Sequence, residues 1–514
     1  MFRTGSKCLE SGRVIRCGWA DLPRRKARSR WGIRPQAAPG VVGRVFPALP
    51  DKVRAAGDGG AGLLRARGRC LTGEGPEVSW RLEMFSKSSQ SGRLVAVLCL
   101  GLVLRVGLAL WVSATNPVTL MQPDSFGYRQ LGLNLLRYGV FSRSPHPPFE
   151  FEIFRAPGYP AFLALVYRLF ETGPLPVVLL QALFAGLTCL LTFFIGRRVF
   201  TAETGLLAAL FVGLDMASVV QASVLMSEVL FGLLLVLGVW LVLRGLAAPA
   251  PGKSEVLAGL VFAGAAFVRP LGYYLVPLLG LALFLRHAFR RELRRGLVRA
   301  GLFFLVPVVL FGAWQGFRLA RTGSARFTQI ECLNMFWYRG CGALSLARRE
   351  PIHALQAELG LDVRSGRLDR WFELHPATRG MSATQLSELW FREGWRLVRR
   401  YPLAAALVHL RGLFVQLFDP GAFELARMAG AEDQESGERL HAVLQVAPLA
   451  LLRYLWHGHR LLLVFSVVGV LWLAFVYTGA IGTLVRRPGF ATALLVLVSG
   501  YCLVVAAGCE AAAR

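Results

Sequence analysis

Apolar runs long enough to cross a membrane recur along this chain of 514 residues. A helix needs about 20 predominantly apolar residues to span the hydrocarbon core of a bilayer. Runs near this length lie at 93–113, 174–196, 203–222, 226–244, 254–268, 271–287, 298–320, 458–483 and 490–508. Since 54% of the residues are hydrophobic, the sequence predicts an all-α polytopic membrane protein built on a multi-helix transmembrane bundle.

The net charge of +27 is distributed in a way that is typical of membrane proteins. Much of the basic charge lies in short loops between the apolar runs, where the positive-inside rule places Lys and Arg of cytoplasmic loops. We therefore expect membrane lipids among the partners of this chain, and no nucleic acid.

Residues 1–83 differ in composition from the rest of the chain. They contain 17 basic and 7 acidic residues, are rich in glycine and proline, and show no apolar periodicity. Two interpretations remain open: a disordered basic or targeting arm, or a mis-assigned leader with true initiation at Met84. No segment here is long and apolar enough for the core of a signal peptide, which favours the leader.

Charge also orients the predicted spans. The run 156–170 is short for a span, and two prolines crowd its start. If this run lies in the interface without crossing, the basic clusters of the short loops all face the cytoplasm, together with the N-terminal side of the first span. These clusters are Arg197–Arg198, Arg244 with Lys253, 286–299 and Arg486–Arg487.

This orientation divides the chain into segments with different expected environments. Residues 84–320 form a transmembrane catalytic module, and its first outer loop, 114–173, carries interfacial helices. Residues 321–455 form a long extracytoplasmic loop with amphipathic helices. Residues 456–514 form C-terminal transmembrane helices, which we expect to continue beyond the last residue given.

Ionisable residues gather at the outer mouths of the predicted helices. Asp124 follows the first span, Glu228 begins the run in "MSEVLF", Arg155 precedes "APGYP", and Arg269 precedes a proline in "FVRPLGYY". Each residue also has a structural interpretation. Asp124 would be a helix N-cap and Arg155 an interfacial anchor. Glu228 and Arg269 would complement helix dipoles.

Two acids and two arginines on one face nevertheless favour a functional site. Charges at the membrane edge are costly to place there and are usually functional. The sequence therefore predicts an active site at the boundary between membrane and water.

Several motifs resemble one family of membrane enzymes. They are "PDSFGYRQLGLNLLRYGVFS", "RAPGYPAFLALVY", "GRRVFTAETGLLAALF", "SVLMSEVLF" and "VRPLGYYLVPLL", which together cover about residues 93–320. Their order and spacing resemble the bacterial branch of the protein-O-mannosyltransferase and lipid A aminoarabinose transferase family (glycosyltransferase family 39-like). This family belongs to the C superfamily of membrane glycosyltransferases, which use polyprenyl-phosphate sugars.

The resemblance implies roles for particular residues. Asp124 matches the proposed catalytic or acceptor-orienting carboxylate, and Glu228 matches a second acid at the outer start of a helix. Arg155 and Arg269 match basic residues that contact the lipid phosphate, with Tyr128 and Tyr159 beside them. Many relatives have a second acid directly after the first; Ser125 stands there in this chain, which weakens a metal-binding role.

The chemistry of this family suits these residue types. A sugar leaves a polyprenyl phosphate with negative charge growing on phosphate oxygens, which arginines pair in a planar, bidentate way. An acceptor hydroxyl loses a proton as it attacks, and a positioned Asp can accept that proton. A single displacement of this kind inverts the anomeric centre. The resemblance thus implies a glycosyltransferase in the cytoplasmic membrane of a bacterium, acting on its outer face.

Other functions and details stay open at the level of the sequence. A multi-pass transporter or lipid-linked sugar flippase is the main alternative, although no internal repeat of the transporter type is visible; a noncatalytic assembly factor is another. The sequence does not identify the donor sugar, or whether the acceptor is a glycan, lipid or protein. A divalent metal stays possible, but Asp124 and Glu228 alone are too few oxygen ligands to argue for one. An exported segment holding Cys332 and Cys341 would allow a disulfide.

Overall fold

The computed structural model describes residues 88–361, 368–432, 455–456 and 458–507. All of these belong to one compact unit, Trp80–Arg514. The described residues form helices and connecting turns with no strand among them, so the predicted all-α class is confirmed. The segment 1–83, the stretch 433–454 and the last residues of the chain lie outside the described residues.

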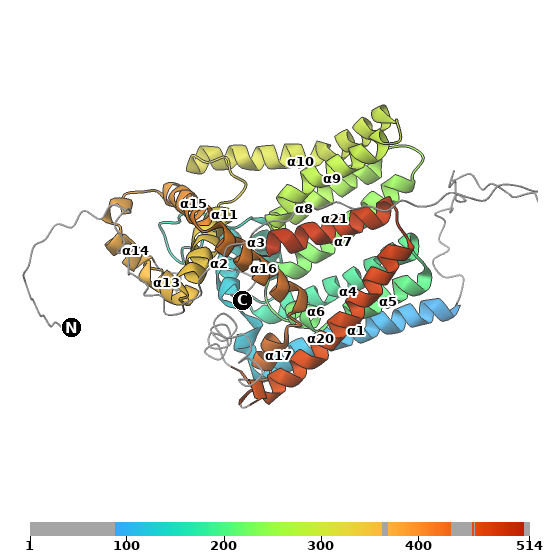
Figure 1. Cartoon of the computed structure of the whole chain (residues 1–514), viewed down its shortest axis with the longest axis horizontal. Coiled ribbons are helices and arrows are strands. Elements are labelled where there is room, and N and C mark those ends of the chain that lie inside the picture. Colours follow the sequence, from blue (N-terminus) through green and yellow to red (C-terminus); the bar gives the residue numbers. More distant parts are fainter. Residues whose placement is uncertain (1–87, 362–367, 433–454, 457, 508–514) are drawn as a thin grey trace, which may run out of the picture. The chain divides into compact units, whose positions relative to one another are not determined.

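Each predicted apolar run forms a helix or a helix pair (Figure 1). Six of the described helices are long and apolar enough to cross a membrane, or up to eight if each of two bent pairs counts as one span. The chain is therefore a multi-pass membrane protein. The helices of these runs are α1 (Ser88–Thr115), α4 (Pro174–Val199), the pair α5 (Ala202–Leu214) and α6 (Met216–Ala222), α7 (Glu228–Ala247), α8 (Lys253–Val268), α9 (Leu271–Ala288), α10 (Leu293–Thr322), α20 (Arg460–Arg486) and α21 (Phe490–Ala506).

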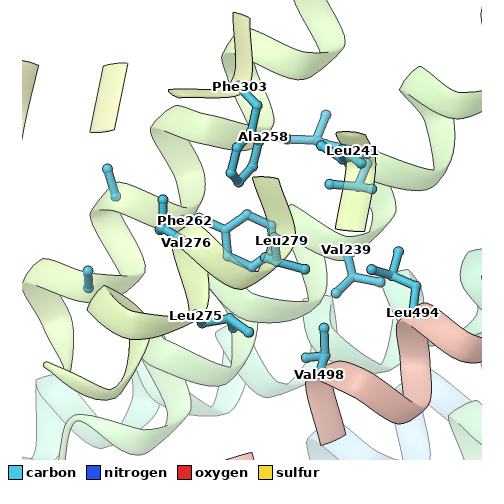
Figure 2. Packing of buried hydrophobic residues seen from close by; sticks show 14 of the residues in the cluster. Val239, Leu241, Ala258, Phe262, Leu275, Val276, Leu279, Phe303, Leu494 and Val498 are labelled. Atoms are coloured by element: carbon cyan, nitrogen blue, oxygen red, sulfur yellow. The ribbon is translucent and has the colours of Figure 1, made fainter. Parts of the chain in front are cut away.

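Helix α8 packs against α7, α9 and α10, and small residues allow the close approach. A Cβ atom on Gly259 would lie 2.1 Å from the carbonyl oxygen of Phe303, so only glycine fits between α8 and α10 there. Gly238 of α7 likewise leaves room for the ring of Phe262. Figure 2 shows Phe262, Leu279 and Phe303 in the apolar core that these helices share. This core fixes the ends of α7, α8 and α9 relative to one another.

Two short helices and a 3₁₀ turn connect α1 to α4. They are η2 (Pro117–Leu120), α2 (Pro123–Tyr138) and α3 (Gly158–Leu169). Helix α3 has 12 residues, a length of about 18 Å at 1.5 Å per residue, and is too short to cross a hydrocarbon core of about 30 Å. It is not among the candidate spans of the described residues. Gly132 of α2 packs directly against Leu163 of α3.

The span formed by α5 and α6 is broken, with a bend of 56° between its halves. A break leaves carbonyl groups at the end of α5 without helical partners. Arg105 of α1, which is 1% exposed, donates hydrogen bonds to the carbonyl oxygens of Val212 and Gly213 at 2.8 and 2.7 Å. Asp215 caps α6 by accepting from the backbone N–H of Ser218 at 2.8 Å. The buried arginine thus satisfies backbone groups that the bend exposes.

The described part of the segment between α10 and α20 is largely helical. Its described elements are α11 (Ile330–Leu333), the π-helical turn η3 (Asn334–Gly340), α12 (Cys341–Arg348), α13 (Ile352–Glu358), α14 (Asp369–Leu374), η4 (Pro376–Thr378), α15 (Ala383–Arg400), α16 (Pro402–Phe418) and α17 (Ala422–Met428). Helix α16 is apolar, packs beside α21, and is bent by 103° from α15.

Helices α16 and α17 are joined by a tight turn that contacts α6 and α20; we call this segment the hairpin and the turn its tip. The backbone of Gly421, between the two helices, lies against Ala217 at the start of α6, and Gly469 of α20 leaves room for Pro420. Gly469 is nine residues into α20, which places the hairpin tip about 14 Å below the start of that helix. Helix α17 then returns to the end of α1, where the Arg427 carbonyl oxygen accepts from Asn116.

The two cysteines of this segment do not form the disulfide that the sequence would allow. Cys332 and Cys341 are buried and remain thiols. Burial raises the pKa of the Cys332 thiol to about 12, with Arg326 opposing the shift. Both side chains belong to the packing between η3, its neighbouring helices and α15.

Candidate active site

The first charged pair of the site joins α2 to the loop before α3. Asp124 lies in the first turn of α2, but the N-cap residue of that helix is Gln122. The Asp124 Oδ1 atom accepts a hydrogen bond from Arg155 Nη2 at 2.8 Å. The Arg155 side chain is 14% exposed and the Asp124 side chain 49% exposed. Arg155 therefore points into the protein and does not extend toward the membrane surface as an anchor would.

The second charged pair joins α7 to the α8–α9 junction. Glu228 is the first residue of α7, and Arg269 ends α8 immediately before Pro270. Their side chains form an ion pair and are both about one-quarter exposed, at 25% and 24%. The helix-terminus positions expected for Glu228 and Arg269 are thus present, and the two termini face each other.

Tyr128 of α2 links the two pairs into one cluster. The guanidinium carbon of Arg155 lies 4.5 Å from the centre of the Tyr128 ring. Burial tends to lower the pKa values of Arg155 and Arg269, but nearby acids and Tyr128 outweigh it, so both pKa values are raised. Asp124 acts on both arginines in this way. The structure therefore brings all four predicted charged residues together.

Tyr159 packs against Tyr128 on the buried side of this cluster. Its ring meets the edge of Tyr128 at a centroid distance of 5.0 Å, and the residue is 0% exposed. The Tyr159 hydroxyl donates to Gln181 Oε1 at 2.8 Å, and Gln181 Nε2 donates to the Val224 carbonyl oxygen at 2.7 Å. The resemblance placed Tyr159 at the lipid phosphate; in this structure its hydroxyl is already engaged inside the bundle.

Ser125 and Leu225 hold the two acids in proximity. The Ser125 hydroxyl donates to the Leu225 carbonyl oxygen at 2.7 Å and accepts from the Gln122 backbone N–H at 2.9 Å. The Leu225 N–H donates to the Leu120 carbonyl oxygen at 2.9 Å. The turn before Glu228 is thereby attached to the start of α2. A serine after Asp124 thus has a structural use that the sequence did not indicate.

Glu152 is a site residue that sequence reasoning missed. It is 3% exposed, and its Oε1 atom accepts from the backbone N–H groups of Phe154 and Arg155 at 2.7 and 3.2 Å. Arg143 pairs with its other oxygen. Glu152 therefore fixes the backbone that carries Arg155. The motif "FEFEIFR" contained an acid three residues before the arginine, but nothing in the sequence distinguished it from Glu150.

Two glycines of the quoted motifs allow close packing around the site. A Cβ atom on Gly127 would lie 2.1 Å from Arg155 Nη1, so the guanidinium rests directly on the backbone of α2. A Cβ atom on Gly158 would lie 2.6 Å from the Phe267 carbonyl oxygen, which brings the start of α3 against the end of α8. The glycines of "DSFGYR" and "APGYP" thus place Arg155 and Arg269 near the same side chain, Tyr128.

The carboxylates of the cluster, which are its potential metal ligands, are each paired with an arginine. Among the described residues, no group of three or more His, Cys, Asp or Glu side chains is arranged to hold a metal ion. Asp124 and Glu228 each pair with an arginine. This arrangement suits the recognition of an anion, because the guanidinium groups offer planar donors and keep their charge at any working pH.

A protein-family comparison covers part of this region. Residues 154–314 match the family model described as dolichyl-phosphate-mannose-protein mannosyltransferase. The match includes Arg155, Glu228 and Arg269, and begins after Asp124. It confirms, for this part of the chain, the predicted resemblance to membrane glycosyltransferases of the C superfamily.

Among solved structures, the chain is similar to oligosaccharyltransferases of Archaeoglobus fulgidus. The enzyme in its apo form gives a TM-score of 0.39 at 16% identity. The archaeal oligosaccharyltransferase AglB, in complex with an inhibitory peptide and a dolichol-phosphate, gives a TM-score of 0.41 at 13% identity. Each comparison covers 84% of this chain and 56% of the other, so the chain spans little more than half their length. No curated protein sequence matches the chain.

Proposed function

We propose that this chain is a glycosyltransferase that moves a sugar from a polyprenyl-phosphate donor to an acceptor hydroxyl, with inversion at the anomeric carbon. The observation that carries the proposal is the cluster of two arginine–carboxylate pairs around Tyr128, at the mouths of α2, α7 and α8. The family match over residues 154–314 supports the same class of chemistry.

The arginines are assigned to the leaving group. Transfer of the sugar leaves a polyprenyl phosphate, on which negative charge accumulates in the transition state, and preorganised cationic donors stabilise that charge. Arg155, held beside Asp124 and over the Tyr128 ring, supplies the first cation. Arg269 supplies the second cation from the end of α8.

Asp124 is assigned as the general base. Its side chain is 49% exposed, so an acceptor hydroxyl can reach it. In a single displacement the acceptor oxygen forms a bond to the anomeric carbon as the bond to the phosphate oxygen breaks. The electron pair of that broken bond stays on the phosphate, and the hydroxyl proton passes to Asp124.

Glu228 and the two tyrosines complete the proposed site. Glu228 orients Arg269 and offers a second carboxylate toward the sugar, which makes it the other candidate catalytic acid. Tyr128 presents its ring to Arg155, a contact that restrains the guanidinium plane. Tyr159 acts as a positioning residue beneath Tyr128. We place the site on the outer face of a bacterial cytoplasmic membrane, because that orientation keeps the short basic loops inside.

The test is sugar transfer from a radiolabelled polyprenyl-phosphate sugar by membranes that contain the wild type or Asp124→Asn. We expect Asp124→Asn to lose at least 100-fold in transfer rate, the lower range for a general base, while donor binding is retained. Asp369→Asn is the matched control, because Asp369 also occupies the first turn of a helix, α14. It removes one helix-terminal charge far from any proposed chemistry in sequence and should transfer at the wild-type rate.

Two results would overturn the proposal. Equal transfer by wild type and Asp124→Asn would leave Asp124 as a helix-terminal charge only. Absence of transfer by the wild type across hexose and pentose donors would exclude the enzyme and favour the transport alternative.

A further inference from the structure

Helix α15 carries an exposed basic stripe that the proposed site does not use. Arg392, Trp395, Arg396, Arg399 and Arg400 recur at spacings of three and four residues, so they lie on one face of the helix. All five are exposed, and Trp395 is 42% exposed. We call these five residues the α15 stripe. Arg399 lies over the Trp395 ring at 5.2 Å, and Glu393 offsets one charge by pairing with Arg396.

The other faces of α15 are occupied by protein. Leu386, Trp390 and Gly394 are buried, and a Cβ atom on Gly394 would lie 2.3 Å from the Met335 carbonyl oxygen of η3. One turn before the stripe, on the same face as Arg392, Glu388 forms an ion pair with Arg326, which lies over Phe391 at 4.8 Å. The rotation of α15 about its own axis is therefore fixed, and the stripe has to face away from the packed side of the helix.

The continuation of the chain places the stripe at the level of the lipid headgroups. After the 103° bend, the α15 stripe is followed directly by the exposed apolar face of α16, which begins at Leu403 with 81% exposure. Leu407, Leu410 and Phe414 continue that face at 53%, 58% and 63% exposure. Since α16 packs beside α21 and ends at the buried hairpin tip, its apolar face lies against hydrocarbon. The last turns of α15 then lie where a membrane helix meets water.

We propose that the α15 stripe binds the headgroups of anionic phospholipids in the leaflet at the Asp124 end of the bundle. Arginines interspersed with a tryptophan suit this depth, because the guanidinium groups reach phosphates and the indole partitions to the interface. Binding would tether α15, and through Arg326 it would also hold Glu331, which accepts a hydrogen bond from Tyr274 of α9 at 2.7 Å. The lipid surface thereby stabilises the segment that contacts the first turn of α9, next to the α8–α9 junction where Arg269 lies.

Hydrogen exchange localises this effect to one helix and does not depend on glycosyl transfer. The full chain is placed in nanodiscs of phosphatidylcholine alone, or of phosphatidylcholine with phosphatidylglycerol, and exchange is followed in peptides from α15 and α13. Each basic residue near an anionic surface contributes about fivefold in affinity. We expect phosphatidylglycerol to slow exchange in the last turns of α15 by at least fivefold and to leave α13 unchanged.

Two variants distinguish lipid binding by the α15 stripe from a general effect of positive charge on the protein. Arg396→Gln/Arg399→Gln/Arg400→Gln should abolish the slowing by phosphatidylglycerol. A control variant changes three other exposed arginines to Gln: Arg349 at the end of α12, Arg370 in α14 and Arg379 in the turn that follows. This variant should retain the slowing by phosphatidylglycerol. Exchange in the remaining helices shows whether either variant still folds.

Three results would overturn the proposal: equal exchange by wild-type α15 in both lipid mixtures, slowing that persists in the stripe variant, and loss of slowing in the control variant. Slowing by inorganic phosphate or soluble poly-glutamate in phosphatidylcholine alone would also overturn it, in favour of a phosphate or acidic-polymer site. None of these results bears on the transfer assay.

Discussion

At the scale of single residues, the site depends on groups that position the arginines as much as on the arginines themselves. Arg155 lies in an irregular segment between α2 and α3, where no helix fixes its backbone. Glu152 supplies that constraint through two backbone N–H groups. Loss of a buried acceptor leaves such donors unsatisfied and costs about 1–3 kcal/mol for each group.

Glu152→Ala should therefore weaken donor binding more than it slows the chemical step. The expected outcome is a rise in KM for the polyprenyl-phosphate sugar of roughly tenfold with a smaller change in kcat, because one misplaced hydrogen-bonding group costs about 1.4 kcal/mol or more. Glu152→Gln keeps the acceptor oxygen and should restore much of the affinity. A fall in kcat at constant KM would contradict this positioning role.

A second residue-scale prediction concerns Arg318 near the end of α10. The residue is 0% exposed, and its Nε, Nη1 and Nη2 atoms have no hydrogen-bond partner among the described residues. A buried charge without a hydrogen-bonded partner costs several kcal/mol. Arg318→Met should accordingly raise the unfolding temperature in detergent, with a gain of about 1–4 kcal/mol.

The matched control for Arg318→Met is on the same helix. Arg299 is equally buried, but it pairs with Glu255 and donates to the Gly245 and Ala248 carbonyl oxygens. Arg299→Met should destabilise the protein by about 3–5 kcal/mol, because it leaves the Glu255 carboxylate buried and unpaired. A loss of stability in both variants would show that Arg318 has a partner under the conditions of the experiment.

At the scale of helices, the site depends on close approach at glycines. Gly158 begins α3, and a Cβ atom there would meet the Phe267 carbonyl group. Gly158→Ala should therefore push α3 away from α8 and cost about 1–3 kcal/mol of stability, with loss of transfer activity. Gly186 in α4 has open space around its Cα atom, so Gly186→Ala should be neutral or stabilising by up to about 1 kcal/mol. Equal stability of both variants by thermal unfolding would contradict the packing argument.

The apolar runs predicted most of these helices to within a few residues, because length and hydrophobicity alone decide whether a segment can span. The same reasoning identified Asp124, Arg155, Glu228 and Arg269, since charges at helix mouths stand out against apolar neighbours. It missed Glu152, Gln181 and Ser125, whose roles depend on which backbone groups the fold leaves unsatisfied. No pattern in a single sequence records that information.

The contacts of the α16–α17 hairpin could not be predicted for a related reason. Helix α16 has 17 residues, nearly enough for a span, and its amphipathic neighbour α15 made the whole segment resemble an external loop. What turns the chain back is the contact of Gly421 with Ala217 and of Pro420 with Gly469. These contacts join residues more than 45 positions apart in the sequence, so only the assembled bundle defines them.

At the scale of the whole molecule, the hairpin decides which side of the membrane each later segment faces. If α16 and α17 return to the side from which they entered, α20 crosses toward the same side as the basic loop after α7. The positive-inside rule is then satisfied by Arg486 and Arg487 at the end of α20. If α16 crossed completely, those arginines would lie with Asp124, and the charge pattern of the bundle would be reversed in its C-terminal part.

Cysteine labelling distinguishes these two topologies. Ala250→Cys, Ala383→Cys and Ala431→Cys each place one thiol at an exposed position, in a background from which the nine native cysteines have been removed. We expect a membrane-impermeant maleimide to label Ala383→Cys and Ala431→Cys from one side and Ala250→Cys from the other. The reason is that α17 ends beside Asn116 and Thr119, at the same end of α1 as Asp124. Labelling of Ala431→Cys together with Ala250→Cys would show that α16 spans the membrane, and the α15 stripe would then lie at the mouth of a complete span.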